Sequence, residues 1–316
     1  MTQDPSAPLV AVVGATGSVK GLEESDRAYG VRAFTRDASK PVAQELEKRG
    51  VDVVTVSLVD GNTEQVFKVF EGVDYALQYL LARYKLLGTS EQGKTRNFVQ
   101  EVNEGKLLID AAKAGGASRI IWSGLPSYEK ISGGSIVGAH HFESKALVTD
   151  YARRQSGGVP FVDLQAGFYG TNLLGVIPSL LMRQEDGLMN AFPWPVPATL
   201  VVPFIDITED YGLWARYMFE LSEGEFPNGQ SVVTHTEIIT LPEMASQVSE
   251  VTRKKVIFKR ISFEEFGENM RKAGFPVWRG LDELGWPTTI SHTVLPRRTR
   301  TWKKFAEMSD WSEILY

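Results

Sequence analysis

Six short apolar runs, separated by stretches of helical character, limit what this chain can fold into more than any other feature of its sequence. The first run, PLVAVV at residues 8–13, stops at Gly14; it is too short for a buried helix and suits a buried parallel strand. Comparable runs follow at residues 31–34, 51–56, 75–80, 119–122 and 161–164. Strands and helices that alternate in this rhythm predict a parallel sheet with right-handed crossovers. We therefore predict an α/β fold with a doubly wound parallel sheet over residues 1–165.

Local signals mark the ends of the intervening helices. Ser39, Lys40 and Pro41 suit the start of one helix, and Gly50 suits its end. Asp60 can cap the next helix. Residues 97–114 place apolar side chains at helical spacing, which predicts a third helix there.

The rhythm changes after residue 165. Residues 185–205 are rich in proline, and the aromatic residues Phe192 and Trp194 within them are expected to close a lobe rather than to bind a ligand. Residues 240–243 and 262–265 match the capping box, and a strand is expected between them at residues 256–258. We predict a smaller C-terminal α/β lobe over residues 166–316, packed over the carboxyl edge of the sheet. Segments near residues 201–235 are candidates to return to the large sheet.

Composition excludes several kinds of chemistry. The 316 residues include no cysteine, which excludes disulfides, thiolate metal sites and cysteine nucleophiles. Only four histidines occur, so we expect no metal site. The formal charge of -5 argues against a basic nucleic-acid-binding surface, and no run approaches the roughly 20 apolar residues of a membrane span. We expect a soluble cytoplasmic protein that contacts neither nucleic acid nor membrane directly, with the nucleus left open as a second location.

The loop after the first strand has the features of a phosphate-binding loop. Gly14 and Gly17 stand where a dinucleotide-binding loop needs a tight turn and close approach of the backbone to pyrophosphate, although a plain tight turn is the alternative. Lys20 occupies the place of the expected third glycine, and Gly21 comes one residue late. Residues 18–30 leave room for only a truncated helix. Either a deletion has damaged this site, or a shortened helix still presents its N-terminus.

The end of the second strand favours NADP over NAD. NAD enzymes usually place an acidic residue at this point to bind the ribose 2′-hydroxyl. Here Thr35 and Arg36 stand there instead, and Lys40 follows at the start of the next helix. Two cations suit a 2′-phosphate through charge-assisted hydrogen bonds, whereas the alternative is a solvated surface arginine.

Candidate catalytic residues follow the fifth strand. Ser123 lies at the carboxyl edge of the sheet, where ligands bind. His141 and Lys145 are four residues apart and share one helix face, and His141 stands where classical short-chain dehydrogenases have their tyrosine. His141 could act as a general acid near neutral pH. Because the tyrosine is missing, we favour the interpretation that His141 only packs or hydrogen-bonds beside a cofactor.

The segment after the sixth strand offers further ligand contacts. Tyr169 could flank a nicotinamide, and Asn172 could bond its amide or a ribose. A core role for Phe168 is as plausible as a ligand role. The remaining polar candidates are expected to be solvated surface; they are His235, His292, Arg297, Arg298, Arg300, Lys303 and Lys304.

An ordered series of segments resembles the NmrA-like family of atypical short-chain dehydrogenase/reductase proteins. The segments are GATG, VRAFTRDASKPVAQEL, VNEGKLLIDAAKAGG, IIWSGL, AHHFESKALVTDYAR, GFYGTNLL and VVPFIDITEDYG, and together they cover nearly the whole chain. The resemblance implies an NADP(H)-binding Rossmann-type domain with a small C-terminal lobe.

The resemblance also implies a set of cofactor contacts. Pyrophosphate would bind at Gly14, Thr16, Gly17 and Ser18, and the 2′-phosphate at Arg36 and Lys40. Lys145 would hold the nicotinamide ribose, with Tyr169 and Asn172 near the ring. Ser57 and Leu80 stand at the strand ends where the family places cofactor contacts, although their residue types depart from its pattern, and Asn103 completes the candidates.

The sequence is compatible with three functions. Many family members are non-catalytic regulators that sense NADP(H) and bind a partner protein such as a transcription factor, and we favour this function because the tyrosine is missing. Others are NADPH-dependent reductases that use the lysine on a hydrophobic carbonyl, quinone or enone. A paralogue that has lost nucleotide binding is the third possibility.

Overall fold

A seven-stranded parallel sheet forms the N-terminal part of the computed structural model, which describes residues 6–14, 19–58, 61–78, 91–155, 158–175, 177, 180–183, 189–273 and 299–315. The strand order is β11-β6-β5-β4-β1-β2-β3, and each neighbouring pair runs parallel. The strands are β1 (Leu9–Val13), β2 (Gly30–Thr35), β3 (Asp52–Thr55), β4 (Tyr75–Gln78), β5 (Arg119–Trp122), β6 (Phe161–Ala166) and β11 (Ser231–Thr234). The chain winds outward from β1 in both directions, which confirms the predicted doubly wound, Rossmann-type sheet.

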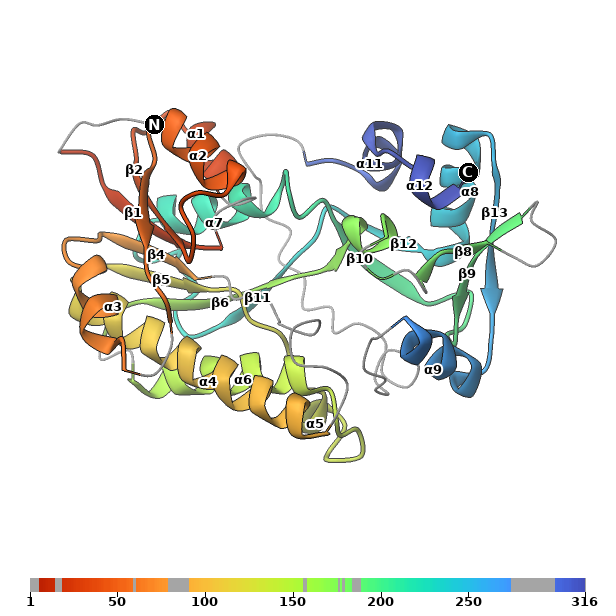
Figure 1. Cartoon of the computed structure of the whole chain (residues 1–316), viewed down its shortest axis with the longest axis horizontal. Helices are drawn as coiled ribbons and strands as arrows, with labels where there is room; N and C mark the ends of the chain where they lie inside the picture. The colour runs from red at the N-terminus through yellow and green to blue at the C-terminus, as the bar shows by residue number, and fades with distance from the viewer. Residues whose placement is uncertain are drawn as a thin grey trace.

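Helices cover both faces of this sheet (Figure 1). One face carries α1 (Val19–Glu23), α2 (Pro41–Lys48) and α7 (Tyr211–Glu220), and the other carries α3 (Thr63–Val69), α4 (Glu91–Ala114) and α6 (His140–Gln155). The short helix α5 (Tyr128–Ile131) lies beside α6. Two apolar cores result, one on each face.

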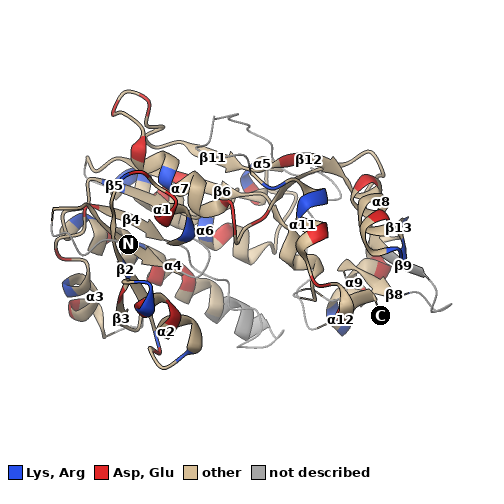
Figure 2. Ribbon diagram, turned by 90° about the horizontal axis from the view of Figure 1, so that it is seen from above, with Lys and Arg blue, Asp and Glu red and all other residues tan. Residues whose placement is uncertain are grey.

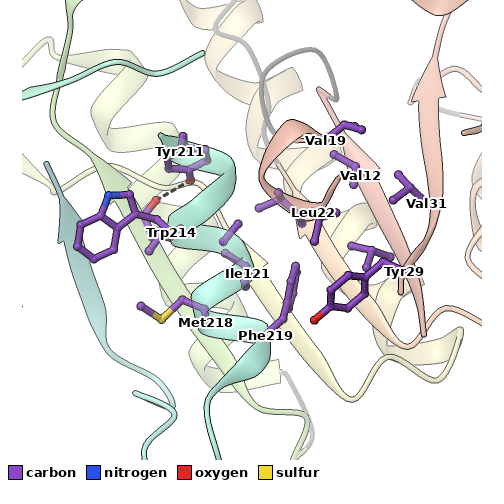
Figure 3. Close-up of a cluster of buried hydrophobic side chains, with 14 of the residues drawn as sticks. Val12, Val19, Leu22, Tyr29, Val31, Ile121, Tyr211, Trp214, Met218 and Phe219 are labelled. Carbon is purple, nitrogen blue, oxygen red and sulfur yellow. Dashed lines mark hydrogen bonds between the residues drawn. The ribbon is translucent and has the colours of Figure 1, made fainter. Parts of the chain in front are cut away.

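Helices α1 and α7 complete the first of these cores. Figure 3 shows Val19 and Leu22 of α1 close to Val12 of β1, with Trp214 and Phe219 of α7 in the same cluster. All five side chains are buried. The Tyr211 hydroxyl donates a hydrogen bond to the carbonyl of Leu164 at 3.0 Å, so α7 is also tied to β6. Residues more than 180 positions apart in the sequence therefore build one layer.

The C-terminal part contains two three-stranded sheets, ordered β12-β10-β7 and β13-β9-β8. Their strands are β7 (Phe168–Tyr169), β8 (Met182–Arg183), β9 (Met189–Trp194), β10 (Val201–Ile205), β12 (Glu237–Thr240) and β13 (Lys255–Arg260). The helical elements are η1 (Gly170–Leu173), α8 (Leu241–Thr252), α9 (Phe263–Lys272), α11 (Trp302–Met308) and α12 (Ser312–Leu315). The chain enters this part directly from the carboxyl ends of β6 and β11, beside the large sheet (Figure 1).

Aromatic side chains dominate the core of this part. Trp302 is fully buried and stacks on Phe305 with 5.4 Å between ring centroids. Phe168, Phe192 and Trp194 are buried in the same cluster. Phe168 therefore packs in the core. The burial of Phe192 and Trp194 in the same core agrees with the expectation that they close the lobe.

Several helix signals agree with the structure. Thr240 and Glu243 form a complete capping box at the start of α8, and the Ser262 hydroxyl accepts a hydrogen bond from the Glu265 amide at α9. The helix predicted over residues 97–114 begins earlier, at Glu91. Asp60 lies outside the described residues.

Neither a membrane span nor a metal cluster is found in the part of the chain that the structure describes. None of its helices combines the length and hydropathy needed to cross a bilayer. No group of three or more His, Asp or Glu side chains among these residues could hold a metal ion. Basic and acidic residues are interspersed along the elements of both parts (Figure 2).

Candidate functional site

Four of the candidate residues follow strands at the carboxyl edge of the large sheet. Gly14 follows β1, Arg36 follows β2, Ser57 lies just beyond β3, and Ser123 follows β5. In doubly wound sheets, ligands bind at this edge, at the point where the strand order reverses. Here that point lies between β1 and β4, which are neighbours in the sheet.

Gly14, the residue after β1, has a left-handed backbone conformation. Gly14 is exposed and has a φ of 77°, a left-handed conformation that glycine adopts without steric cost. Thr16, Gly17 and Ser18 lie outside the described residues. The helix that follows, α1, has only five residues, which confirms the truncated helix expected from the spacing.

Gly21 has a packing role that the sequence does not reveal. A Cβ atom at this position would lie 2.0 Å from the backbone carbon of Gly212 and 2.5 Å from the Leu213 nitrogen. Only glycine allows the α1 and α7 backbones to approach this closely. The late glycine therefore serves helix packing, and Lys20 beside it forms an ion pair with Glu209.

The same Glu209 carboxylate connects α1 to the C-terminal segment. Arg300 contacts Glu209 at 2.9 Å and Asp206 at 3.2 Å, and its backbone N–H donates to the Asp210 carboxylate at 2.9 Å. Asp206 and Asp210 are buried. Arg300 is thus an ion-paired, half-buried residue rather than solvated surface, since the fold places it over acidic side chains distant in sequence.

The expectation that His235 is solvated surface is also wrong. His235 is buried, with 8% of its surface exposed, because it directly follows β11 of the large sheet. Lys303 and Lys304 are exposed, as expected, and form ion pairs with Glu250 and Glu307. His292, Arg297 and Arg298 lie outside the described residues.

The loop after β2 holds its acidic residue in a local turn. The Asp37 carboxylate accepts hydrogen bonds from the Ser39 hydroxyl at 2.6 Å and the Ser39 amide at 2.9 Å. These bonds, with a smaller contribution from Lys40, lower the pKa of Asp37 below its usual range. Arg36 and Lys40 are both exposed. The end of β2 therefore presents two exposed cations, while the Asp37 carboxylate is hydrogen-bonded to Ser39.

The other candidate cofactor contacts are Ser57, Asn103 and Leu80. Ser57 is half-buried, and its carbonyl accepts a hydrogen bond from the Asn62 side chain at 2.7 Å. Asn103 is exposed on α4. Leu80 lies outside the described residues.

Lys145 is buried between two helices and a strand. Its side chain is 7% exposed, and its ammonium lies 2.9 Å from Oε1 of Glu101 on α4. The same ammonium lies 5.5 Å from the centre of the Trp122 ring, at the end of β5. Ser123, the next residue, is also buried, and its amide donates to the Gln78 carbonyl at 2.9 Å. Lys145 therefore lies beside Trp122, the residue that precedes Ser123.

His141 does not have the electrostatics of a neutral-pH general acid. Burial, together with the positive charge of Lys145, lowers the pKa of His141 to about 3. The imidazole is consequently uncharged at neutral pH. This agrees with a packing or hydrogen-bonding role beside a cofactor better than with proton donation.

Tyr169 and Asn172 follow β6 on β7 and η1. Both side chains are half-buried. Tyr169 packs against the first apolar core, and the Asn172 carbonyl accepts a hydrogen bond from the Ile177 amide at 3.2 Å. Both residues directly follow the carboxyl end of β6, and ligands of Rossmann-type sheets bind at the carboxyl edge.

Asp163 is a buried acid that is not among the candidate residues predicted from the sequence. It lies on β6, where its Oδ2 accepts hydrogen bonds from Gln165 and Ser231, each at 2.7 Å. A Cβ at Gly124 would lie 2.0 Å from the other oxygen. Burial raises the pKa of Asp163 to about 6 despite these hydrogen bonds. The available signal was a charged residue inside the apolar run FVDLQA.

We expect Asp163→Asn to remove a pH dependence of folding. The unfolded carboxyl ionises near 3.8, whereas the folded one retains its proton up to a pKa of about 6, so wild-type stability falls as pH rises through this window. Relative to the variant, the wild type should lose about 1.4 kcal/mol between pH 5 and pH 7. Urea unfolding of both proteins at these two pH values measures the difference. Parallel pH profiles would contradict this assignment.

Comparison with known proteins gives a consistent family match. The model of the NmrA-like family matches residues 6–311. The NmrA-like family domain-containing oxidoreductase ptmS of Penicillium ochrochloron is 25% identical over 304 residues, which cover 90% of this chain and 81% of that relative.

Solved structures share the fold across nearly the whole chain. NmrA, a negative transcriptional regulator, is solved in complex with NAD; it is 20% identical, with a TM-score of 0.72 over 98% of this chain and 97% of its own. Its NADP complex is 19% identical, with a TM-score of 0.69 and the same coverage. The Escherichia coli quinone oxidoreductase QOR2, complexed with NADPH, is 20% identical, with a TM-score of 0.60 over 97% and 93% of the two chains.

Proposed function

We propose, from the premise that this chain belongs to the NmrA-like family, that it binds NADP(H) at the carboxyl edge of its large sheet and acts as a redox-sensing or regulatory protein with little or no catalysis. The observation that carries the proposal is the pair of exposed cations, Arg36 and Lys40, at the end of β2. Relatives of the same fold that bind NADP or NADPH support it.

The residues at this edge fit a nucleotide with a 2′-phosphate. The left-handed turn at Gly14 allows the backbone after β1 to approach a pyrophosphate. Arg36 offers a planar set of N–H donors that suits a phosphate, and Lys40 adds a second charge. The carboxylate of Asp37, the nearby acid, accepts a hydrogen bond from Ser39, so it does not take the place of the two cations. When bound, the nicotinamide would supply hydride-transfer chemistry.

The chemistry around Lys145 favours regulation over catalysis. His141 stands at the position of the catalytic tyrosine in classical short-chain dehydrogenases, and its low pKa leaves it uncharged at neutral pH. General acid catalysis needs a group that holds its proton near the working pH. We therefore propose that bound NADP(H) is a signal read by a partner protein, such as a transcription factor.

We expect Arg36→Ala to remove most of the discrimination between NADPH and NADH. The wild type should bind NADPH at least tenfold more tightly, which corresponds to about 1.4 kcal/mol. The variant should lose this preference because the 2′-phosphate loses its charge-assisted donors. Calorimetric titration with each nucleotide measures the ratio, and Arg154→Ala, at an exposed arginine near the end of α6, is the matched control. Equal wild-type affinity for the two nucleotides would overturn the NADP(H) assignment.

NADPH-dependent reduction is the second candidate function. It is favoured by the relatives named as oxidoreductases and by the burial of Lys145 beside Trp122, the residue before Ser123. The substrate would be a hydrophobic carbonyl, quinone or enone. NADPH absorbance followed over a panel of such compounds separates the two functions, since a regulator binds the nucleotide without consuming it.

A further inference from the structure

We propose that Glu101 is the positioning residue for Lys145, holding its ammonium in the orientation in which it binds NADP(H). This inference rests on the proposed function and assigns a role to a residue of α4 that is distant in sequence from the candidate site. The Glu101 side chain is 14% exposed, and its Oε1 lies 2.9 Å from the Lys145 ammonium. A contact this short between two largely buried groups of opposite charge is a close ion pair.

The Glu101 carboxylate is itself fixed by a second contact. The hydroxyl of Ser144, the residue before Lys145, donates to Oε2 of Glu101 at 2.9 Å. One carboxylate therefore binds two consecutive residues of α6, one with each oxygen. Ser144 is fully buried, so this contact is shielded from water.

Close packing keeps the two helices in register. A Cβ at Gly105, one turn along α4 from Glu101, would lie 2.5 Å from the Val148 side chain and 3.1 Å from the Trp122 ring. The missing side chain lets α4 approach both α6 and the end of β5 at this level. This close packing lies one turn along α4 from the Glu101–Lys145 ion pair and involves the same Trp122 ring that lies 5.5 Å from the Lys145 ammonium.

Two physical reasons connect this geometry to nucleotide binding. A buried ammonium requires a partner of opposite charge, because an unpaired buried charge is strongly unfavourable. A lysine side chain also has four rotatable carbon links, and fixing it before binding removes an entropic cost from the binding step. An ammonium carries three N–H donors, so a lysine paired with a carboxylate can also donate to a ribose hydroxyl.

The test is Glu101→Gln, which keeps the size of the side chain and an oxygen that accepts from Ser144 but removes the charge. NADPH titrated calorimetrically into the full chain should bind about tenfold more weakly than to the wild type, the order expected when one long side chain must be ordered on binding. Glu250→Gln is the matched control: it makes the same change in the ion pair between Glu250 and Lys303, outside the candidate site, and should bind NADPH within about twofold of wild type.

Thermal unfolding of the nucleotide-free proteins separates positioning from mere stabilisation. A helix-to-helix ion pair without a role in binding would lower the unfolding temperature of Glu101→Gln and leave its NADPH dissociation constant unchanged, and that result would overturn the inference. If Glu101→Gln does not fold, Glu101→Asp keeps the charge but withdraws it by one methylene, and it too must weaken NADPH binding; wild-type affinity in this variant would equally overturn the inference. Wild-type protein that binds no NADPH would overturn the proposed function and this inference together.

Discussion

Gly21→Ala is expected to destabilise the protein by at least about 3 kcal/mol, at the upper end of the usual cost of overpacking. The new methyl group would meet the backbone of Gly212 and Leu213, with its closest atom 2.0 Å away. A backbone cannot move aside as a flexible side chain can, so α1 would have to separate from α7 and open the apolar core that both helices cover. Urea unfolding followed by circular dichroism measures the loss.

Gly224→Ala provides the control for this experiment. A Cβ at Gly224 would meet no atom within 4 Å, and its backbone shows no positive φ. This variant should remain within about 0.5 kcal/mol of the wild type, as surface substitutions usually do. Similar stabilities of the two variants would show that α1 does not pack against α7 as described.

Lys145→Ala is expected to have the largest effect on any chemistry. If the protein is a reductase, NADPH-dependent turnover should fall by a factor of about 10²–10⁴, the usual contribution of a general acid–base group. His141→Ala should cost less, because the low pKa of His141 keeps it uncharged at neutral pH. Steady-state NADPH oxidation with the most active quinone or carbonyl measures both effects.

Two controls separate the role of Lys145 from the loss of a surface charge and from the effect of an unpaired buried carboxylate. Lys48→Ala removes an exposed lysine of α2 and should leave turnover unchanged. Glu101→Gln combined with Lys145→Ala removes both members of the buried ion pair, so the loss of turnover can be measured without an unpaired buried carboxylate. If the protein is a regulator, wild type binds NADPH and shows no turnover. Substantial turnover that survives Lys145→Ala would contradict the regulatory function and the proposed site.

Local sequence signals predicted the elements of the large sheet well. The run at residues 119–122 coincides with β5, and the proline at residue 41 opens α2 as expected. The short spacing after Gly17 predicted a truncated helix, and α1 has five residues. These features depend on short-range patterns of burial, capping and turn formation, which one sequence displays directly.

Contacts between distant segments could not be predicted in the same way. Glu101 and Lys145 are 44 positions apart, and nothing in either helix sequence shows that α4 packs on α6 at this level. Arg300 looked like one member of a basic surface cluster, because Asp206 and Glu209 reach it only after the C-terminal segment has folded back. Charge pairing of this kind is a property of tertiary structure and leaves no periodic signal in the chain.

The most direct test of the account is calorimetric titration of the wild-type chain with NADPH and with NADH under identical conditions. We predict saturable binding of NADPH, at least about tenfold tighter than that of NADH, because Arg36 and Lys40 are presented at the end of β2. Binding of neither nucleotide, or equal binding of both, would contradict it.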